Sequence, residues 1–247
     1  MAINMGGISV AYQPIVLVSN GEIKGFEVLA RWYDRKIGQI PPDIFIKESQ
    51  KTGLYKKLNR MIIFKAINEM KDVLINNKSI YISINMDANE IGSIELINDI
   101  LIKIKEYRIS PSQIAIEILE GSTSDLKSIE ESILNIKKLG LMVFIDDFGT
   151  GYSNLSYLSN LRIDKIKIDK IFTQSAGTNS SASFILIKIC EIAEKIQSSV
   201  IFEGVENNQQ KDMILSISPN ASAQGWLYSK AVDITRMKYI LEKTLGI

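Results

Sequence analysis

The stretch ISVAYQPIVLVSNGEIKGFEVLA, residues 8–30, contains two β-rich apolar runs separated by a short polar segment. The connection of Ser19, Asn20 and Gly21 is too short to hold a crossover helix, which parallel neighbours would need. We therefore predict that the runs 8–18 and 23–30 form an antiparallel hairpin.

Six further short apolar runs follow the hairpin, and most of them are almost continuously apolar, as in strands buried on both faces of a parallel sheet. They cover residues 79–86, 113–119, 141–146, 163–169, 198–204 and 221–227. Apolar residues recur at helical spacing in 58–74, 97–104, 126–136, 184–196 and 237–241. Strands that alternate with helices in this way predict an α/β fold, a TIM-like (β/α)8 barrel with one antiparallel strand near the N-terminus.

The composition is that of an ordinary globular protein, and no linker or low-complexity stretch divides it. A length of 247 residues suits one barrel, so we expect 1–247 to form a single stand-alone domain. The net charge of +1 gives no reason to expect a nucleic acid polymer as partner. No apolar run is long enough to span a membrane, and the first residues lack signal-peptide features, so a cytoplasmic location is expected.

The chain contains no histidine and a single cysteine, Cys190. These counts exclude Ser-His-Asp and Cys-His catalysis, His-ligated zinc and an internal disulfide. An enzyme of this composition has to use carboxylates, lysine, amides, hydroxyls or a hard metal ion.

Polar side chains stand at the ends of most of the predicted strands, which is where a barrel carries its chemistry. They are Glu27, Asn85, Glu117, Asp146, Asp147, Lys167, Glu203 and Gln224. Ionised carboxylates in apolar strands are costly unless they are paired or bound to metal. Two divalent cations would offset the five carboxylates to within one charge, which Lys167 would supply. Oxygen ligands favour Mg²⁺ or Mn²⁺ at such a site.

The strongest local motif is DDFGTGYSNLSYL, Asp146–Leu158. Two adjacent aspartates leave a strand and enter a loop that contains Gly149 and Gly151. Glycine at these positions permits positive φ angles and a close approach of the backbone to a ligand. The sequence SN at 153–154 is expected to cap a following helix.

Taken together, these blocks resemble the EAL domain family of bacterial cyclic di-GMP phosphodiesterases. The resemblance covers about residues 8–245, and the blocks occur in family order: YQPIV, GFEVLARW, ISINM, IEILE, DDFGTGYSNLSYL, KIKID, FEGVE and QGWL. It implies an eight-stranded barrel with one antiparallel strand. It also implies metal-dependent hydrolysis of cyclic di-GMP to linear pGpG, in which two metal ions activate water.

The resemblance assigns metal-binding and catalytic roles residue by residue. The implied metal ligands are Glu27, Asn85, Glu117, Asp146, Asp147 and Glu203, with Asp146 bridging two cations. The implied catalytic residues are Glu203, Lys167 and Glu27. In these roles Glu203 takes part in water activation, and Lys167 contacts the attacking water or the phosphate.

The resemblance also implies residues for substrate binding and for coupling to a partner. The expected substrate-binding residues are Gln13, Leu29, Arg31 and Gln224, and Arg31 would hold a phosphate. Glu120 would anchor the loop after Asp147, which in the family couples the metals to a dimer interface. A homodimer is expected on this basis, and a regulatory protein partner is a further expectation.

Departures from the family pattern are few. The signature triplet reads EVL, with Val28 where alanine is usual, and Val28 is expected to face away from Glu27 and to affect packing only. Other departures are Phe202, Asn207, Trp226 and Ala231. None of them removes a proposed ligand.

Alternative interpretations remain open at this point. The chain could be a non-hydrolytic cyclic di-GMP receptor or a protein-interaction regulator with the same fold. It could also be a Schiff-base enzyme that uses Lys167, although nearby carboxylates should keep this amine protonated. For single residues a structural role competes: an ion pair for Lys167 or Arg31, packing for Leu29 or Gln224, and a plain loop carboxylate for Glu120.

Overall fold

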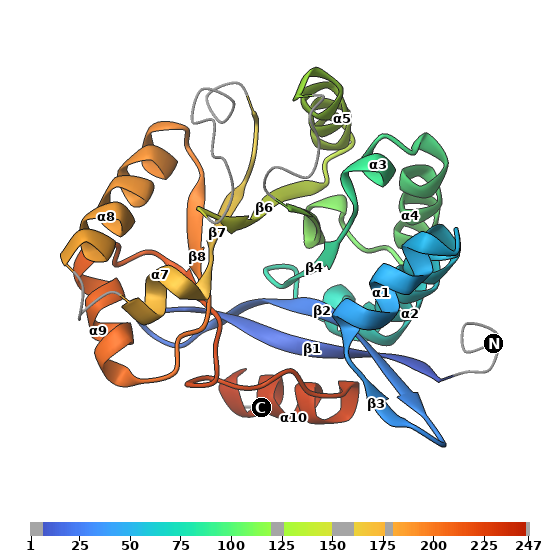
Figure 1. The fold of residues 1–247 in the computed structure, drawn as a ribbon, viewed down its shortest axis with the longest axis horizontal. Coiled ribbons are helices and arrows are strands. Elements are labelled where there is room, and N and C mark those ends of the chain that lie inside the picture. Colours follow the sequence, from blue (N-terminus) through green and yellow to red (C-terminus); the bar gives the residue numbers. More distant parts are fainter. Residues whose placement is uncertain (1–6, 120–125, 150–160, 176–179, 246–247) are drawn as a thin grey trace.

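The computed structural model describes residues 7–119, 126–149, 161–175 and 180–245, in which strands and helices alternate along the chain (Figure 1). The strands are β1 (Ile8–Leu17), β2 (Ile23–Asp34), β3 (Gly38–Ile40), β4 (Tyr81–Asn85), β5 (Ile114–Leu119), β6 (Met142–Phe148), β7 (Lys165–Ile168), β8 (Ser199–Phe202) and β9 (Ser222–Ala223). The helices are α1 (Pro42–Lys51), α2 (Tyr55–Asn76), α3 (Ala88–Ile91), α4 (Ile94–Glu106), α5 (Leu126–Lys138), α7 (Lys170–Ser175), α8 (Ser180–Lys195), α9 (Asn208–Ile217) and α10 (Ile234–Leu245), and a 3-10 turn, η2 (Pro111–Gln113), precedes β5.

Eight of the described strands close a barrel in the order β1-β2-β4-β5-β6-β7-β8-β9, and β9 pairs with β1 to complete the ring. Strand β1 is antiparallel to both of its neighbours, β2 and β9, while the remaining pairs in the ring are parallel. The predicted barrel with one reversed strand is therefore confirmed. Strand β3, which the sequence analysis missed, lies outside the ring and pairs antiparallel with the C-terminal end of β2.

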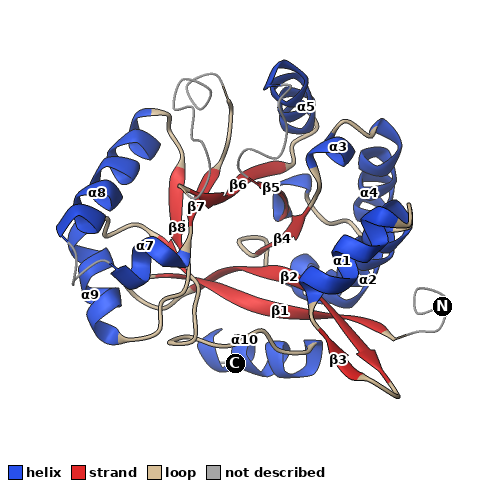
Figure 2. Ribbon diagram, viewed as in Figure 1, coloured by secondary structure: helices blue, strands red, loops and turns tan. Residues whose placement is uncertain are grey.

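The helices lie around the outside of the strands (Figure 2). All five segments with helical spacing fall on helices, namely α2, α4, α5, α8 and α10. The pattern missed α1, α3, α7 and α9, which have at most ten residues each and too few turns for a clear period. Each helix in the described ranges is too short or too polar to cross a lipid bilayer.

A small apolar group fills the interior of the barrel, separate from the larger core between strands and helices. It consists of Ile15, Tyr81, Ala115, Phe144 and Ile201. Ala115, Phe144 and Ile201 precede Glu117, Asp146 and Glu203 by two residues on their strands. Residues two apart on a strand share a face, so these three carboxylates point into the barrel above an apolar floor.

The Gln113 side chain, only 1% exposed, ties the end of α2 to the start of β5. Its amide nitrogen donates to the carbonyl oxygens of Leu74, Asn77 and Ile80, at 2.8, 3.0 and 2.9 Å. We expect Gln113→Ala to lower the free energy of unfolding by about 2–3 kcal/mol, because it leaves buried carbonyls unpaired. Urea unfolding measures this change. The exposed Gln209→Ala on α9 is the control, and a loss no larger than that of the control would contradict the assignment.

Candidate active site

Lys167 stands at the centre of the strand-end carboxylates, and its side chain is 1% exposed. Its Nζ atom lies 2.8 Å from Asp146 Oδ1, 3.0 Å from Glu117 Oε2, 3.0 Å from Glu203 Oε1 and 3.6 Å from Glu27 Oε1. These residues come from five different strands or strand ends, β2, β5, β6, β7 and β8. The barrel therefore gathers around one ammonium group four of the five carboxylates that the sequence singled out.

Two side-chain amides fix the orientation of these carboxylates. Asn85 Nδ2 donates to Glu27 Oε1 at 3.2 Å. Gln224 Nε2 donates to Glu27 Oε2 at 2.7 Å and to Glu203 Oε1 at 3.0 Å. Gln224 therefore links the carboxylates of β2 and β8, and its buried position makes it a support of the site.

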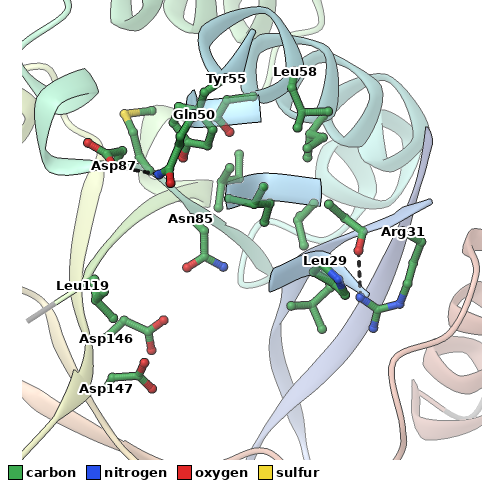
Figure 3. Close-up of a pocket in the computed structure, with 18 residues that line it drawn as sticks. Leu29, Arg31, Gln50, Tyr55, Leu58, Asn85, Asp87, Leu119, Asp146 and Asp147 are labelled. Atoms are coloured by element: carbon green, nitrogen blue, oxygen red, sulfur yellow. Dashed lines mark hydrogen bonds between the residues drawn. The ribbon is translucent and has the colours of Figure 1, made fainter. Parts of the chain in front are cut away.

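Asp146 and Asp147 are neighbours, and a regular strand would send their side chains to opposite faces. The β6–β7 ladder shifts register between Ile145 and Phe148, and Asp147 has a φ of 53°. A non-glycine residue in this left-handed region stores strain, which is typical of functional sites. The distortion brings both carboxylates to the same end of one cavity (Figure 3).

Asp146, Asp147 and Glu203 each offer an oxygen atom, and these oxygens lie within 4.8 Å of one another. This spacing fits one hard divalent cation with carboxylate ligands. Glu27 and Glu117 also contact Lys167, and Asn85 contacts Glu27, so these three residues add further oxygen atoms to the same cluster. The donor set, which contains only oxygen, thus suits Mg²⁺ or Mn²⁺.

Burial and mutual repulsion raise the pKa values of several carboxyl groups in the cluster. Burial raises the pKa of Glu203 to about 8, against the effect of Lys167 and with the help of Asp146 and Glu27. Burial also raises the pKa of Glu117 well above its usual range, although Lys167 opposes this change. The pKa of Asp147 rises to about 6 through burial, Asp146 and Asp169.

Lys167 itself remains protonated. Burial alone would lower the pKa of Lys167, but Glu117, Glu203, Glu27 and Asp146 together hold that pKa well above its usual value. A Schiff-base mechanism requires a neutral amine as nucleophile. The electrostatics of the site therefore argue against the Schiff-base alternative.

We expect Mn²⁺ or Mg²⁺ to stabilise the protein, since a cation would relieve the repulsion among these carboxylates. At a concentration 100 times the dissociation constant, binding to the folded state alone adds about 2.7 kcal/mol. Scanning calorimetry with and without the cation measures this gain as a rise in melting temperature. Asp147→Asn should reduce the rise. An unchanged melting temperature in millimolar Mn²⁺ would argue against the metal site.

A cavity of about 340 Å³ adjoins the carboxylates and is lined by residues of β2, α1, α2, β4 and β6. Leu29 and Arg31, two predicted substrate-binding residues, line it together with Asn85, Asp146 and Asp147 (Figure 3). The Arg31 guanidinium donates to the carbonyl of Ala30 at 2.9 Å. The volume of the cavity is within the range of small-molecule sites in proteins.

Two other predicted site residues, Gln13 and Glu120, are not among the described residues that line the cavity. Gln13 is the Cα partner of Glu27 in the hairpin ladder, and its amide donates to the carbonyl of Ser229 at 3.3 Å, so it lies beside the site without lining the cavity. Glu120 lies outside the described residues. The same holds for residues 150–158 of the DDFGTGYSNLSYL motif, including the expected SN cap.

Sequence reasoning missed Asp169, which is 8% exposed and follows Lys167 by two residues. Its carboxylate accepts the backbone N–H of Ile171 at 2.8 Å, and its charge helps to raise the pKa of Asp147. The alternation in KIKID contained this signal, because Lys167 and Asp169 share a strand face. Sequence reasoning also missed Gln50, Tyr55 and Asp87, which line the cavity from elements distant in sequence.

The departures from the family pattern are accommodated locally. Val28 and Phe202 are buried in the core between strands and helices, and Val28 also lines the cavity next to Leu29, so its effect on packing alone stays a prediction. Asn207 caps α9, where its side chain accepts the N–H of Gln210 at 3.0 Å. Trp226 is exposed, and Lys230 Nζ lies 4.4 Å from its ring centroid. The structure gives no reason for Ala231.

A family model described as the EAL domain matches residues 1–231, which is most of the chain. The chain belongs to the EAL domain family. A relative from Escherichia coli named "Probable cyclic di-GMP phosphodiesterase PdeB" is 36% identical, over 94% of this chain and 44% of its own length. The "Cyclic di-GMP phosphodiesterase RocR" of Pseudomonas aeruginosa is 28% identical, over 91% of this chain and 57% of its own length.

Among solved structures, the EAL fold here superposes on "PaMucR Phosphodiesterase, c-di-GMP complex" with a TM-score of 0.89 and 27% identity, over 96% of both chains. This EAL chain spans about half the length of the PdeB and RocR relatives. The likeness to MucR extends over the whole barrel.

Proposed function

We propose that this EAL domain hydrolyses cyclic di-GMP to linear pGpG with the help of two divalent cations. The observation that carries the proposal is the oxygen-only cluster around Lys167, with Asp146, Asp147 and Glu203 spaced for a cation at the end of a cavity. The names of PdeB and RocR and the MucR complex support cyclic di-GMP as substrate.

In this proposal, one cation would bind Asp146, Asp147 and Glu203, and the other Glu27, Asn85, Glu117 and Asp146. Such cations lower the pKa of an attacking water and offset the charge of the phosphate. The buried carboxylates of the site support this role, because burial and the neighbouring carboxylates raise the pKa of Glu117 and Glu203, and a bound cation would favour their ionised forms.

The chain's own residues would bind and orient the reacting groups. The protonated Lys167 would place a fixed positive charge next to the phosphate and stabilise charge that develops on it. Glu203, oriented by Gln224, would accept the proton of the attacking water. Arg31 would turn from the Ala30 carbonyl to a phosphate oxygen, and Leu29 would contact the nucleoside in the cavity.

The proposal also includes what the resemblance implies about assembly. We propose a homodimer, a regulatory protein partner and a cytoplasmic location, with residues 1–247 acting as one domain. Analytical ultracentrifugation tests the dimer, and a monomer at all concentrations would reject it.

The activity is tested by incubating purified protein with cyclic di-GMP and Mg²⁺ or Mn²⁺, and by identifying products chromatographically. We expect linear pGpG, and no product in the presence of EDTA. Calorimetry on the same sample separates the alternatives. Binding of cyclic di-GMP without any cleavage would favour the receptor and reject the enzyme.

A further inference from the structure

A second cavity lies at the end of the barrel opposite the carboxylates, where connections lead into β4 and β5. It has a volume of about 440 Å³, and its walls include Leu101, Ile104, Pro111, Lys78, Lys105 and Arg108. Residue 78 precedes β4, residues 108–111 precede β5, and 101–105 lie near the end of α4, which packs beside α2 (Figure 1). This cavity is called the basal groove below.

The basic side chains of the basal groove are exposed and are not neutralised by carboxylates. Among the ion pairs of the described residues, none includes Lys78, Lys105 or Arg108. Lys78 Nζ donates to the backbone carbonyl of Arg108 at 3.3 Å, and Glu106, at the end of α4, pairs with Lys103 at 3.0 Å. Lys105 suits the negative end of the α4 dipole, but this leaves its N–H donors open to an anion.

The end of α5 continues this surface. A Cβ atom on Gly140 would lie 3.4 Å from the Cβ atom of Pro111, which lines the groove. Leu139, just before Gly140, is 41% exposed, and Lys138 is exposed as well. The basal groove, Lys138 and Leu139 together form what is called the basal surface below. It combines four unpaired basic side chains with exposed apolar ones.

An anionic lipid bilayer has the matching chemistry for both kinds of side chain. Phosphate headgroups attract the basic residues, and each Lys or Arg near such a membrane contributes roughly fivefold to the affinity. The boundary between headgroups and acyl chains accommodates apolar side chains such as Leu139. A nucleic acid would use the basic residues through its phosphates but would leave the apolar residues without a partner.

We propose that the basal surface docks this domain on an anionic membrane, with Leu139 inserted at the headgroup boundary. The carboxylates Glu27, Glu117 and Glu203 gather at the opposite end of the barrel, where the same lipid charge repels them. The domain therefore lies with its candidate active site facing the water, where a soluble nucleotide reaches it. The inference does not depend on the proposed hydrolysis.

Sedimentation with lipid vesicles tests the electrostatic part of this inference. The purified chain is mixed, in EDTA and at millimolar lipid, with vesicles of phosphatidylcholine alone or of equal parts of phosphatidylcholine and phosphatidylglycerol. The variant is the double change Lys105→Gln and Arg108→Gln. The control, Lys56→Gln with Lys57→Gln, removes the same charge from the exposed start of α2 at the carboxylate end. Melting temperatures show whether each protein is folded.

We expect the wild type and the control to bind the phosphatidylglycerol vesicles equally within about twofold, because salt screens charges more than about 10 Å away. Both should stay in solution with phosphatidylcholine alone. The Lys105→Gln and Arg108→Gln protein should bind about 25-fold more weakly, from two losses of roughly fivefold. Binding of this variant equal to that of the control would overturn the inference. So would a wild type that binds neither vesicle or both equally.

A tryptophan at position 139 tests the insertion. The native Trp32 and Trp226 lie near the carboxyl end of β2 and after β9, away from the basal surface. We expect vesicles with brominated acyl chains to quench the added fluorescence of Leu139→Trp and to leave that of the wild type nearly unchanged. Bound Leu139→Trp protein without quenching would overturn the inference. Duplex DNA that binds as tightly as the vesicles, through Lys105 and Arg108, would also overturn it and would indicate a nucleic-acid surface.

Discussion

Lys167→Met is expected to abolish hydrolysis and to destabilise the metal-free protein by about 3–5 kcal/mol, the cost of breaking a buried ion pair. Methionine occupies a similar volume, so packing is largely kept. However, Glu117, Asp146 and Glu203 lose the ammonium group that lies 2.8–3.0 Å from each of them. Urea unfolding in EDTA measures the destabilisation, and the hydrolysis assay measures the lost charge at the phosphate.

The loss of folding stability in Lys167→Met should become smaller as the pH falls. Burial raises the folded-state pKa of Glu117 and Glu203, so the folded protein binds protons more tightly than the unfolded chain. Stability is therefore regained as the pH falls from about 8 toward the ordinary range of a glutamate, near 4.5. The control is Lys188→Met, whose ion pair with Glu191 is half exposed and contributes little. A Lys167→Met protein as stable and as active as this control would contradict the account.

Asp146→Asn is expected to reduce hydrolysis by about 1,000-fold or more. Asp146 is the carboxylate that the proposed function assigns to both cations, and it contacts Lys167 at 2.8 Å. Asparagine keeps the shape but removes the charge, and the loss of several kcal/mol of charge stabilisation corresponds to this factor. Initial rates at saturating Mn²⁺ measure the change.

The matched control for Asp146→Asn is Asp212→Asn on α9, which is exposed and distant in the fold. It should leave the rate unchanged within about twofold. A rate for Asp146→Asn within tenfold of the wild type would mean that this carboxylate does not bridge the cations. Circular dichroism of both variants shows whether either change disturbs the barrel.

The barrel could be predicted because two local signals decide it. The three-residue connection at 19–21 forces β1 and β2 to be antiparallel, and the later apolar runs have the continuous pattern of buried parallel strands. Once these strands surround one axis, residues at their carboxyl ends must converge. For this reason the sequence alone predicts that Glu27, Glu117 and Glu203 lie near each other.

The remaining features depend on contacts that no local pattern contains. The register shift and left-handed φ that turn Asp147 beside Asp146 depend on pairing between β6 and β7. The cavity beside the carboxylates is lined by residues 37 positions apart, Gln50 and Asp87, which share a hydrogen bond. Strand β3 has only three residues and leaves no periodic signal. By contrast, the sequence already predicts carboxylates close to the Lys167 amine, and the structure adds which four of them contact it.

The proposed hydrolysis is tested most directly by comparing the wild type with Glu27→Ala in a cyclic di-GMP cleavage assay at saturating Mg²⁺ or Mn²⁺. Glu27 is 6% exposed and contacts Asn85, Lys167 and Gln224, so its removal takes away a carboxylate that the proposal assigns to a cation. We predict that the wild type forms linear pGpG, while Glu27→Ala remains folded by circular dichroism and forms none. Cleavage by Glu27→Ala at the wild-type rate, or no cleavage by the wild type under any metal condition, would contradict the proposal.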